Sequence, residues 1–263
     1  MIAVLRSEWL KLRTTTIPWL LTGIALLITA LSLLGYFLNH GDQGPNHSGG
    51  FGQPTPNIPH TVQQLRDLVG RGIGGYIFAL LLGALVITVE FRHKTVTTSF
   101  LTTPHRTRFV LGKILISAIT GAVLAVIVLA ATVIGAGIVL SAEGGSFSAM
   151  ARQIGAVAPG MILVYALFAV LGVGVGSLLT NQVAAIIVCL GWFLIVETII
   201  EAIWTGTTRW LPSGAAAAAA SVSAGRGQNV GLFTWWQGSI LILLYGAVFA
   251  ALGSYLLTRR DIT

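Results

Sequence analysis

Six long apolar runs constrain the fold more than any other feature of this sequence of 263 residues. A helix rises about 1.5 Å per residue, so each run is long enough, or nearly so, to cross the hydrocarbon core of a bilayer. Lipid offers backbone amides no hydrogen-bond partner, so each run must pair its own amides as a helix. We therefore expect an all-α integral membrane protein, a single transmembrane domain over 1–263, with spans at 17–38, 72–89, 114–142, 153–179, 183–204 and 235–257.

The composition supports this fold class. Hydrophobic residues make up 55% of the chain and charged residues only 9%, whereas a soluble domain carries about 25% charged residues. So few charges cannot cover a water-facing surface, and the runs with their loops leave no room for a separate soluble domain. The lone Cys189 excludes a disulfide framework and a cysteine zinc site. The first outer loop contains three histidines, His40, His47 and His60. Their spacing is irregular and no clustered carboxylates accompany them, so we expect no metal site.

The basic residues predict the orientation. Cytoplasmic loops of membrane proteins carry an excess of Lys and Arg, and placing both termini in the cytoplasm puts ten basic residues inside and five outside. The inner set is Arg6, Lys11, Arg13, Arg92, Lys94, Arg106, Arg108, Lys113, Arg259 and Arg260; the outer set is Arg66, Arg71, Arg152, Arg209 and Arg226. We expect a multi-pass protein of the cell membrane. Scattered charges without a binding motif predict no nucleic-acid partner.

The segment 1–16 has the pattern of a basic amphipathic helix. Ile2, Leu5, Trp9 and Leu12 recur at three- and four-residue steps, and charged residues fall largely between them. Such a helix suits the inner headgroup layer of the bilayer. The residues expected at this interface are Arg6, Trp9, Lys11 and Arg13. The alternative is a charged leader that only precedes the first span.

The connection between the second and third spans is the most informative loop. It is longer than a turn requires, and it is strongly basic. Phe91, Val96, Phe100 and Leu101 would form an apolar stripe on a short helix that ends before Pro104. That helix would offer a docking face to a cytoplasmic partner. The alternative is a solvated basic tether that serves topology alone, and spacing does not separate the two.

Two motifs resemble a known family. The loop reads EFRHKTV over 90–96 and TTPHR over 102–106 before an apolar span returns, and the N-terminal segment reads SEWLKLR over 7–13. Both are similar to the permease subunits of type-2 ATP-binding cassette exporters, and the six-span layout matches along the whole chain. The resemblance implies that 1–16 is a connecting elbow helix and that the loop contains a coupling helix.

The resemblance also implies partners and site residues. The coupling helix would fit a cleft on a separate cytoplasmic ATPase, and two permeases, identical or paralogous, would work with two ATPases. The ATPase-coupling residues would be Glu90, Phe91, Arg92, His93, Thr95, Phe100, Thr103, Pro104 and Arg106. ATP and magnesium would bind the partner, because this chain contains no G-x-x-x-x-G-K-[ST] phosphate loop. We expect no catalysis and no cofactor on this chain.

A few residues inside the spans are candidates for packing or transport. Gly172 and Gly176 lie four apart on one helix face, which favours close approach of another helix. Glu197 lies about one turn deeper than Glu201 at the outer end of the fifth span, and a carboxylate at such a depth often faces a transport path or gate. A solvated outer face is the alternative. A run of six alanines, Ala215–Ala220, suggests a short helix at the outer surface.

Other classes of function remain open on these residues. A purely structural or sensory membrane subunit is one, and a membrane enzyme is disfavoured because the sequence shows no catalytic cluster. An ion- or proton-coupled secondary transporter would need ionisable groups near the middle of the membrane. Glu197 is the only candidate for such a group, so this class is the alternative to an ATP-driven exporter.

Overall fold

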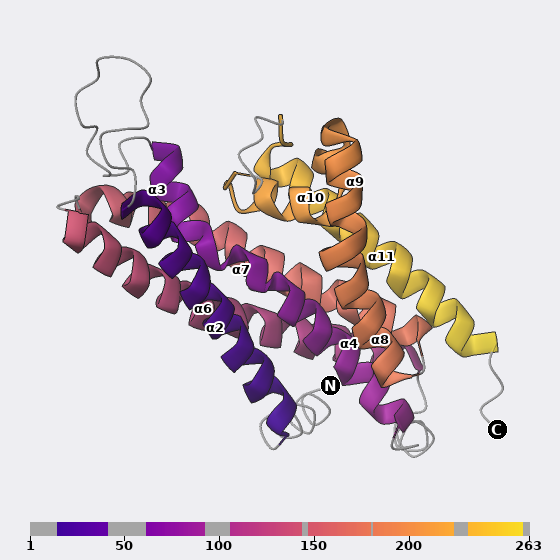
Figure 1. Ribbon diagram of the computed structural model, residues 1–263. Coiled ribbons are helices and arrows are strands. Elements are labelled where there is room, and N and C mark those ends of the chain that lie inside the picture. The colour runs from indigo at the N-terminus through magenta and orange to yellow at the C-terminus, as the bar shows by residue number, and fades with distance from the viewer. Residues whose placement is uncertain are drawn as a thin grey trace.

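The structure is a computed structural model that describes residues 15–41, 62–92, 106–143, 147–179, 181–223 and 231–259 (Figure 1). These residues are nearly all helical, and no strand occurs among them. The elements are α2 (Thr16–Gly41), α3 (Val62–Val69), the 3₁₀ helix η1 (Gly70–Gly75), α4 (Tyr76–Arg92), α6 (Arg106–Glu143), α7 (Phe147–Leu178), α8 (Gln182–Gly191), the π-helical turn η2 (Trp192–Val196), α9 (Glu197–Ile203), the 3₁₀ helix η3 (Thr205–Trp210), α10 (Pro212–Ala219) and α11 (Trp235–Arg259).

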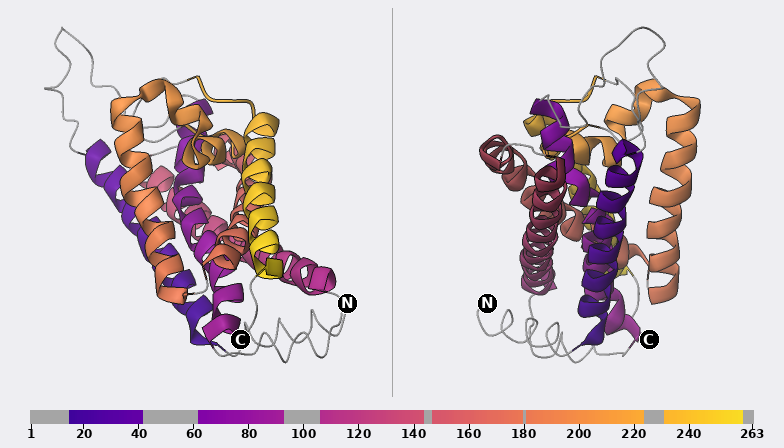
Figure 2. Two further views of the ribbon diagram at one scale, coloured as in Figure 1. Left: turned by 90° about the vertical axis from the view of Figure 1, so that its right-hand side faces the viewer. Right: turned by 60° about the vertical axis from the view of Figure 1, so that its left-hand side comes forward.

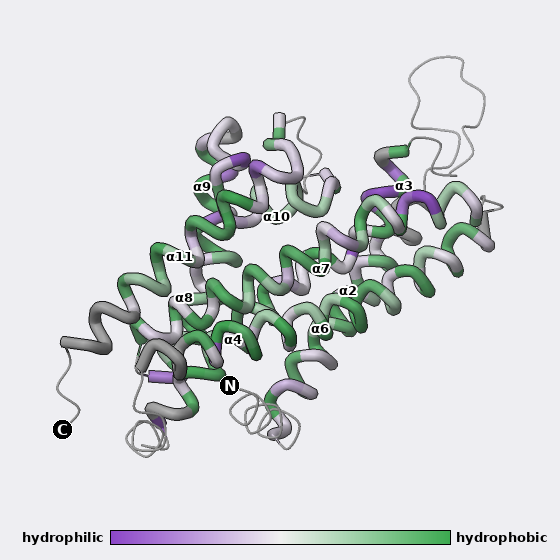
Figure 3. Tube along the Cα trace, turned by 180° about the vertical axis from the view of Figure 1, so that it is seen from behind, coloured by the Kyte–Doolittle hydropathy of each residue, from purple (hydrophilic) through white to green (hydrophobic). Residues whose placement is uncertain are grey.

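Six helical segments are long and apolar enough to cross a membrane, which confirms the predicted fold class. Span 5 is the combination of α8, η2 and α9. Helices α2, α6 and α8 begin at one end of the bundle, where α4, α7 and α11 finish, and we name it the Arg92 end (Figure 2). The opposite end is the Trp204 end. The helices are apolar along most of their lengths, and hydrophilic stretches gather in α3 and near the Trp204 end of α9 (Figure 3).

The helices extend beyond the predicted spans where polar side chains find partners. The second span does not begin at Gly72, because α3 and η1 continue it without a break from Val62. Charged residues in these added turns are bonded: Arg66 Nε donates to Gln153 Oε1 at 3.0 Å, and Asp67 accepts from Ser223. The third span begins earlier than predicted, since α6 starts at Arg106.

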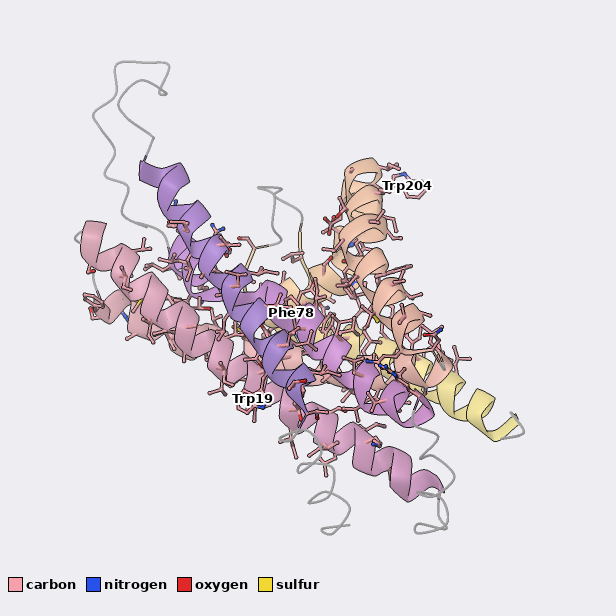
Figure 4. The ribbon with its side chains drawn as sticks, turned by 60° about the horizontal axis from the view of Figure 1, so that its bottom comes forward. Trp19, Phe78 and Trp204 are labelled. Carbon is pink, nitrogen blue, oxygen red and sulfur yellow. The ribbon has the colours of Figure 1, made fainter. Side chains whose placement is uncertain are left out.

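Helices α4 and α7 form the centre of the bundle. In the most apolar stretch of each span, 72% of the residues are buried in the second span and 61% in α7. The share is only 22% in α2, span 5 and α11. Helix α7 packs against α4, α6 and α11, while span 5 rests mainly on α4. Phe78 of α4 is 8% exposed in this centre, whereas Trp19 and Trp204 are 63% and 68% exposed near opposite ends of the bundle (Figure 4). Tryptophan at such positions is typical of membrane interfaces.

The alanine run forms a short helix, as predicted, and its side chains are buried. All six residues of Ala215–Ala220 are buried, with exposures of 0–7%. Helix α10 lies between the Trp204 end of span 5 and the start of α11 (Figure 2), and it packs on α11 and α7. The small side chains explain this position, because they let the α10 backbone approach both neighbours closely.

Candidate functional sites at the two ends of span 5

The first candidate site lies at the Arg92 end, where the predicted coupling segment leaves α4. Arg92 is the last residue of α4, and its Nη1 donates to Oε1 of Gln182 at 3.1 Å. Gln182 is the first residue of α8, and Asn181 caps that helix by accepting from the backbone N–H groups of Val183 and Ala184 at 2.9 and 3.4 Å. Arg92 therefore joins the start of the segment to the start of span 5.

The other predicted coupling residues are only partly covered by the structure. The backbone of Glu90 and Phe91 belongs to α4, and that of Arg106 opens α6. His93, Thr95, Phe100, Thr103 and Pro104 lie outside the described residues, as do the interfacial candidates Arg6, Trp9, Lys11 and Arg13. The coupling helix and the elbow helix therefore stay predictions.

Lys113 is a residue of this end that the sequence analysis misplaced. It was counted with the basic loop, yet it lies inside α6, is 2% exposed, and its Nζ donates to the Val86 carbonyl of α4 at 3.3 Å. A lysine can bury its hydrocarbon stem along apolar neighbours while its ammonium reaches a polar atom. The available signal was its apolar flank, because Leu111 and Ile114 stand on either side.

Gly172 and Gly176 lie where α7 meets α4. A Cβ added at Gly172 would lie 2.0 Å from the Leu80 carbonyl oxygen, and one at Gly176 would lie 2.6 Å from that of Ala84. From the opposite side, a Cβ at Gly83 would lie 1.9 Å from the Ala169 carbonyl oxygen. The two helices thus approach backbone to backbone, which only glycine at these positions allows. Gly83 is a contributor that the sequence analysis missed.

The second candidate site lies at the Trp204 end and centres on Glu197. This carboxylate is only 2% exposed, so the solvated-face alternative does not describe it. Glu197 follows the π-helical turn η2 directly, and Nε1 of Trp192 donates to its Oε1 at 3.2 Å across that turn. π-helical turns widen a helix locally and are frequent at functional sites.

Helix α10 brings Ser213 to the same carboxylates. The Ser213 hydroxyl donates to Glu201 Oε1 at 3.1 Å, and both this hydroxyl and the Ser213 backbone N–H approach Glu197. Pro212 and Ser213 form the first turn of α10, and the positive end of a helix dipole favours a nearby anion. The carboxylates therefore join span 5 to α10.

An aromatic cluster lies on the neighbouring part of span 5. The rings of Tyr76 and Phe168 are 4.2 Å apart between centroids, and Phe193 of η2 lies 5.6 Å from Tyr76 and 5.8 Å from Phe168. These rings come from α4, α7 and η2, so they pack the middle of span 5 against the centre of the bundle. Stacked and tilted ring pairs at such distances are favourable.

The comparisons with known proteins agree with this architecture. A family model described as "ABC-2 family transporter protein" matches residues 4–196. A search among curated proteins finds no match. The matched region covers well over half of the chain and includes both segments on which the resemblance rested. This chain is therefore a member of the ABC-2 transporter family, a multi-pass membrane protein that is the permease component of an ATP-binding cassette transporter.

Proposed function

We propose that this chain forms the translocation path of an ATP-driven exporter and is driven by a separate cytoplasmic ATPase that docks on segment 90–106. ATP and magnesium bind that partner, and a second permease, identical or paralogous, completes the path. The family match supports this function over an ion- or proton-coupled secondary transporter. Glu197, buried in span 5, is the candidate for the path or its gate.

The orientation in this proposal places the Arg92 end in the cytoplasm of a cell-membrane protein. The excess of ten basic residues over five supports it. Both termini then lie in the cytoplasm, on the side where a soluble ATPase has access to the loop between α4 and α6.

One observation carries the coupling mechanism: the hydrogen bond from Arg92 to Gln182, at 3.1 Å. The docking segment leaves α4 and returns as α6, and Lys113 of α6 bonds back to α4. A displacement of the segment is thereby delivered to α4, α6 and span 5 together. Because nucleotide binding and release favour different ATPase arrangements, they bias these helices between two states.

Capture of the ATPase tests the docking segment. The chain, tagged and expressed in its own host, would be purified as wild type and with Phe91, Arg92 and Phe100 all changed to alanine. We expect the wild type to carry an ATP-binding cassette ATPase, identified by mass spectrometry, and the triple variant to lose at least about nine-tenths of it, since docking energy concentrates in a few aromatic and arginine residues. Arg152→Ala, an exposed arginine at the Trp204 end, should retain the ATPase.

Two outcomes would contradict the proposal. The first is full retention of the ATPase by the triple variant. The second concerns orientation: Cys189→Ala combined with Glu90→Cys leaves one reporter thiol in the chain, because Cys189 is its lone cysteine. Labelling of that thiol by an impermeant maleimide in intact cells would place the segment outside the cell.

A further inference from the structure

Helix α10 is held at its two ends by similar polar links. At its start, the Ser213 hydroxyl donates to Glu201 of α9 at 3.1 Å. Beyond its end, the backbone N–H and the hydroxyl of Ser223 donate to the two carboxylate oxygens of Asp67 in α3, each at 2.8 Å. Each link is a serine bonded to a carboxylate, so the two provide a matched comparison within one molecule.

Helix α10 packs closely between α7 and α11, and we call this position its seat. A Cβ added at Gly160 of α7 would lie 2.3 Å from the Ala219 carbonyl oxygen, and one at Gly238 of α11 would lie 2.6 Å from that of Ala215. Backbone thus meets backbone on both sides, which leaves little room between α10 and its neighbours α7 and α11. The Asp67 link joins this seat to a packed element, because Leu68 and Val69 beside it are fully buried.

The outer half of span 5 is packed differently. Among residues 192–203, all of which the structure describes, Glu197 is the only buried side chain. Its apolar neighbours point away from the bundle: Leu194, Ile195, Ile199 and Ile203 are 51–68% exposed. The inner half is anchored by apolar burial, with Ala185 and Cys189 at 0% and 3%. Phe193, at the start of this half, packs on Tyr76 and Phe168. Beyond Phe193 no apolar side chain up to residue 203 is buried, so polar atoms make the attachment of α9 to α10.

We propose that Glu197 and Glu201 are positioning residues that latch the outer half of span 5 onto the first turn of α10, and that this latch releases when span 5 moves. Each carboxylate accepts hydrogen bonds, and near the membrane surface water can replace a released partner, so release is reversible. The π-helical turn η2 supplies the point at which the helix can bend. The link to transport rests on the proposed function, while the latch itself does not.

Distance measurements on the full chain in lipid nanodiscs test the latch. In a Cys189→Ala background, spin labels would be placed at Ile203→Cys of α9 and Ile240→Cys of α11, positions that are 68% and 50% exposed. We expect one narrow distance distribution in this parent. Glu197→Ala should add a population of longer distances, raised about tenfold over the parent because the carboxyl group that Trp192 and Ser213 contact is lost. Glu197→Gln keeps an acceptor oxygen and should restore the parent distribution.

Asp67→Ala is the matched control. It removes the carboxylate at the other end of α10, and we expect the distance between α9 and α11 to be unchanged. An unchanged distribution in Glu197→Ala would overturn the proposal, and so would an equal change in Asp67→Ala. If Glu197→Ala does not fold, Ser213→Ala decides alone: longer distances support the latch, and the parent distribution overturns it.

The measurement uses no partner protein, so its result is separate from that of the ATPase capture. Loss of the latch response with normal ATPase capture would reject the latch and leave the proposed function standing. A normal latch response in a chain that captures no ATPase would reject the coupling and leave the latch.

Discussion

The contact between α4 and α7 and the contact between α9 and α10 show two ways of holding helices together in one protein. At the first, glycines on both helices allow backbones to meet, as at Gly83 and Gly172. At the second, Glu201 and Ser213 bond through side-chain oxygens. Lipid tails are as apolar as the side chains, so helices in a bilayer gain little from burying apolar surface. We therefore expect the closely packed contact between α4 and α7 to be permanent, and the hydrogen-bonded contact between α9 and α10 to be the one that can be released.

The largest effect is expected at the glycine contact. Gly172→Ala would place a Cβ 2.0 Å from the Leu80 carbonyl oxygen and 2.9 Å from the Ala84 nitrogen, both backbone atoms that cannot rotate away. We expect the free energy of unfolding to fall by about 3 kcal/mol or more, measured by SDS titration in mixed micelles. Gly191→Ala in span 5 has no atom within 4 Å and should leave stability unchanged or slightly higher. Equal losses at the two sites would refute the comparison.

A smaller effect is expected at the seat of α10. Gly238→Ala on α11 would place a Cβ 2.6 Å from the Ala215 carbonyl oxygen. Helix α10 has only eight residues, so fewer contacts are disturbed than between α4 and α7, and we expect a loss of about 2 kcal/mol, seen as a lower unfolding temperature. Gly246→Ala on the same helix meets its nearest atom at 3.8 Å and is the control. If Gly238→Ala unfolds at the wild-type temperature, α10 is not seated as the structure describes.

The smallest effect concerns a single hydrogen bond in the packed centre. The hydroxyl of Tyr165, a fully buried residue, donates to the Gly72 carbonyl. Tyr165→Phe removes that donor without changing the ring, and we expect a loss of about 1 kcal/mol. Tyr245→Phe removes the hydrogen bond that the Tyr245 hydroxyl donates to the Trp210 carbonyl. That bond is 2.6 Å long and lies in a more exposed setting. That loss should be less than half as large by the same SDS titration, and a larger loss would contradict the comparison.

The sequence allowed the six apolar helices to be predicted because each depends on consecutive residues. The fifth span was predicted at 183–204, and the structure has a helical segment there from Gln182 to Ile203. The prediction failed where a polar residue inside a helix is satisfied by a distant segment. Arg66 was counted with the basic residues outside the spans, yet it lies in α3, which continues into α4, and Gln153 bonds it. Lys113 was assigned to a loop, yet the Val86 carbonyl accepts from it.

For the candidate sites, too, the sequence indicated the local features but not the partners from distant segments. The spacing of Gly172 and Gly176 indicated a helix contact, but not that α4 is the partner or that Gly83 faces it. The depth of Glu197 left a buried and a solvated position both open. The structure shows it buried, with Trp192 bonded to it and with the first turn of α10 bringing Ser213 to the carboxylates. No local pattern places a residue sixteen positions further along the chain beside Glu197.

The amino-acid sequence alone determined that this is a multi-pass membrane protein, that it has six segments apolar enough to cross the membrane, and which family its two charged segments resemble. Apolar length and the choice of residues in a short motif are properties of adjacent positions, so no tertiary contact is needed to recognise them. Only the tertiary structure decided that α10 is buried, that Arg92 reaches Gln182, that Glu197 is buried, and that Glu201 bonds Ser213 of α10. Each of these depends on the distance between segments far apart in the chain, which helix packing sets and local periodicity does not.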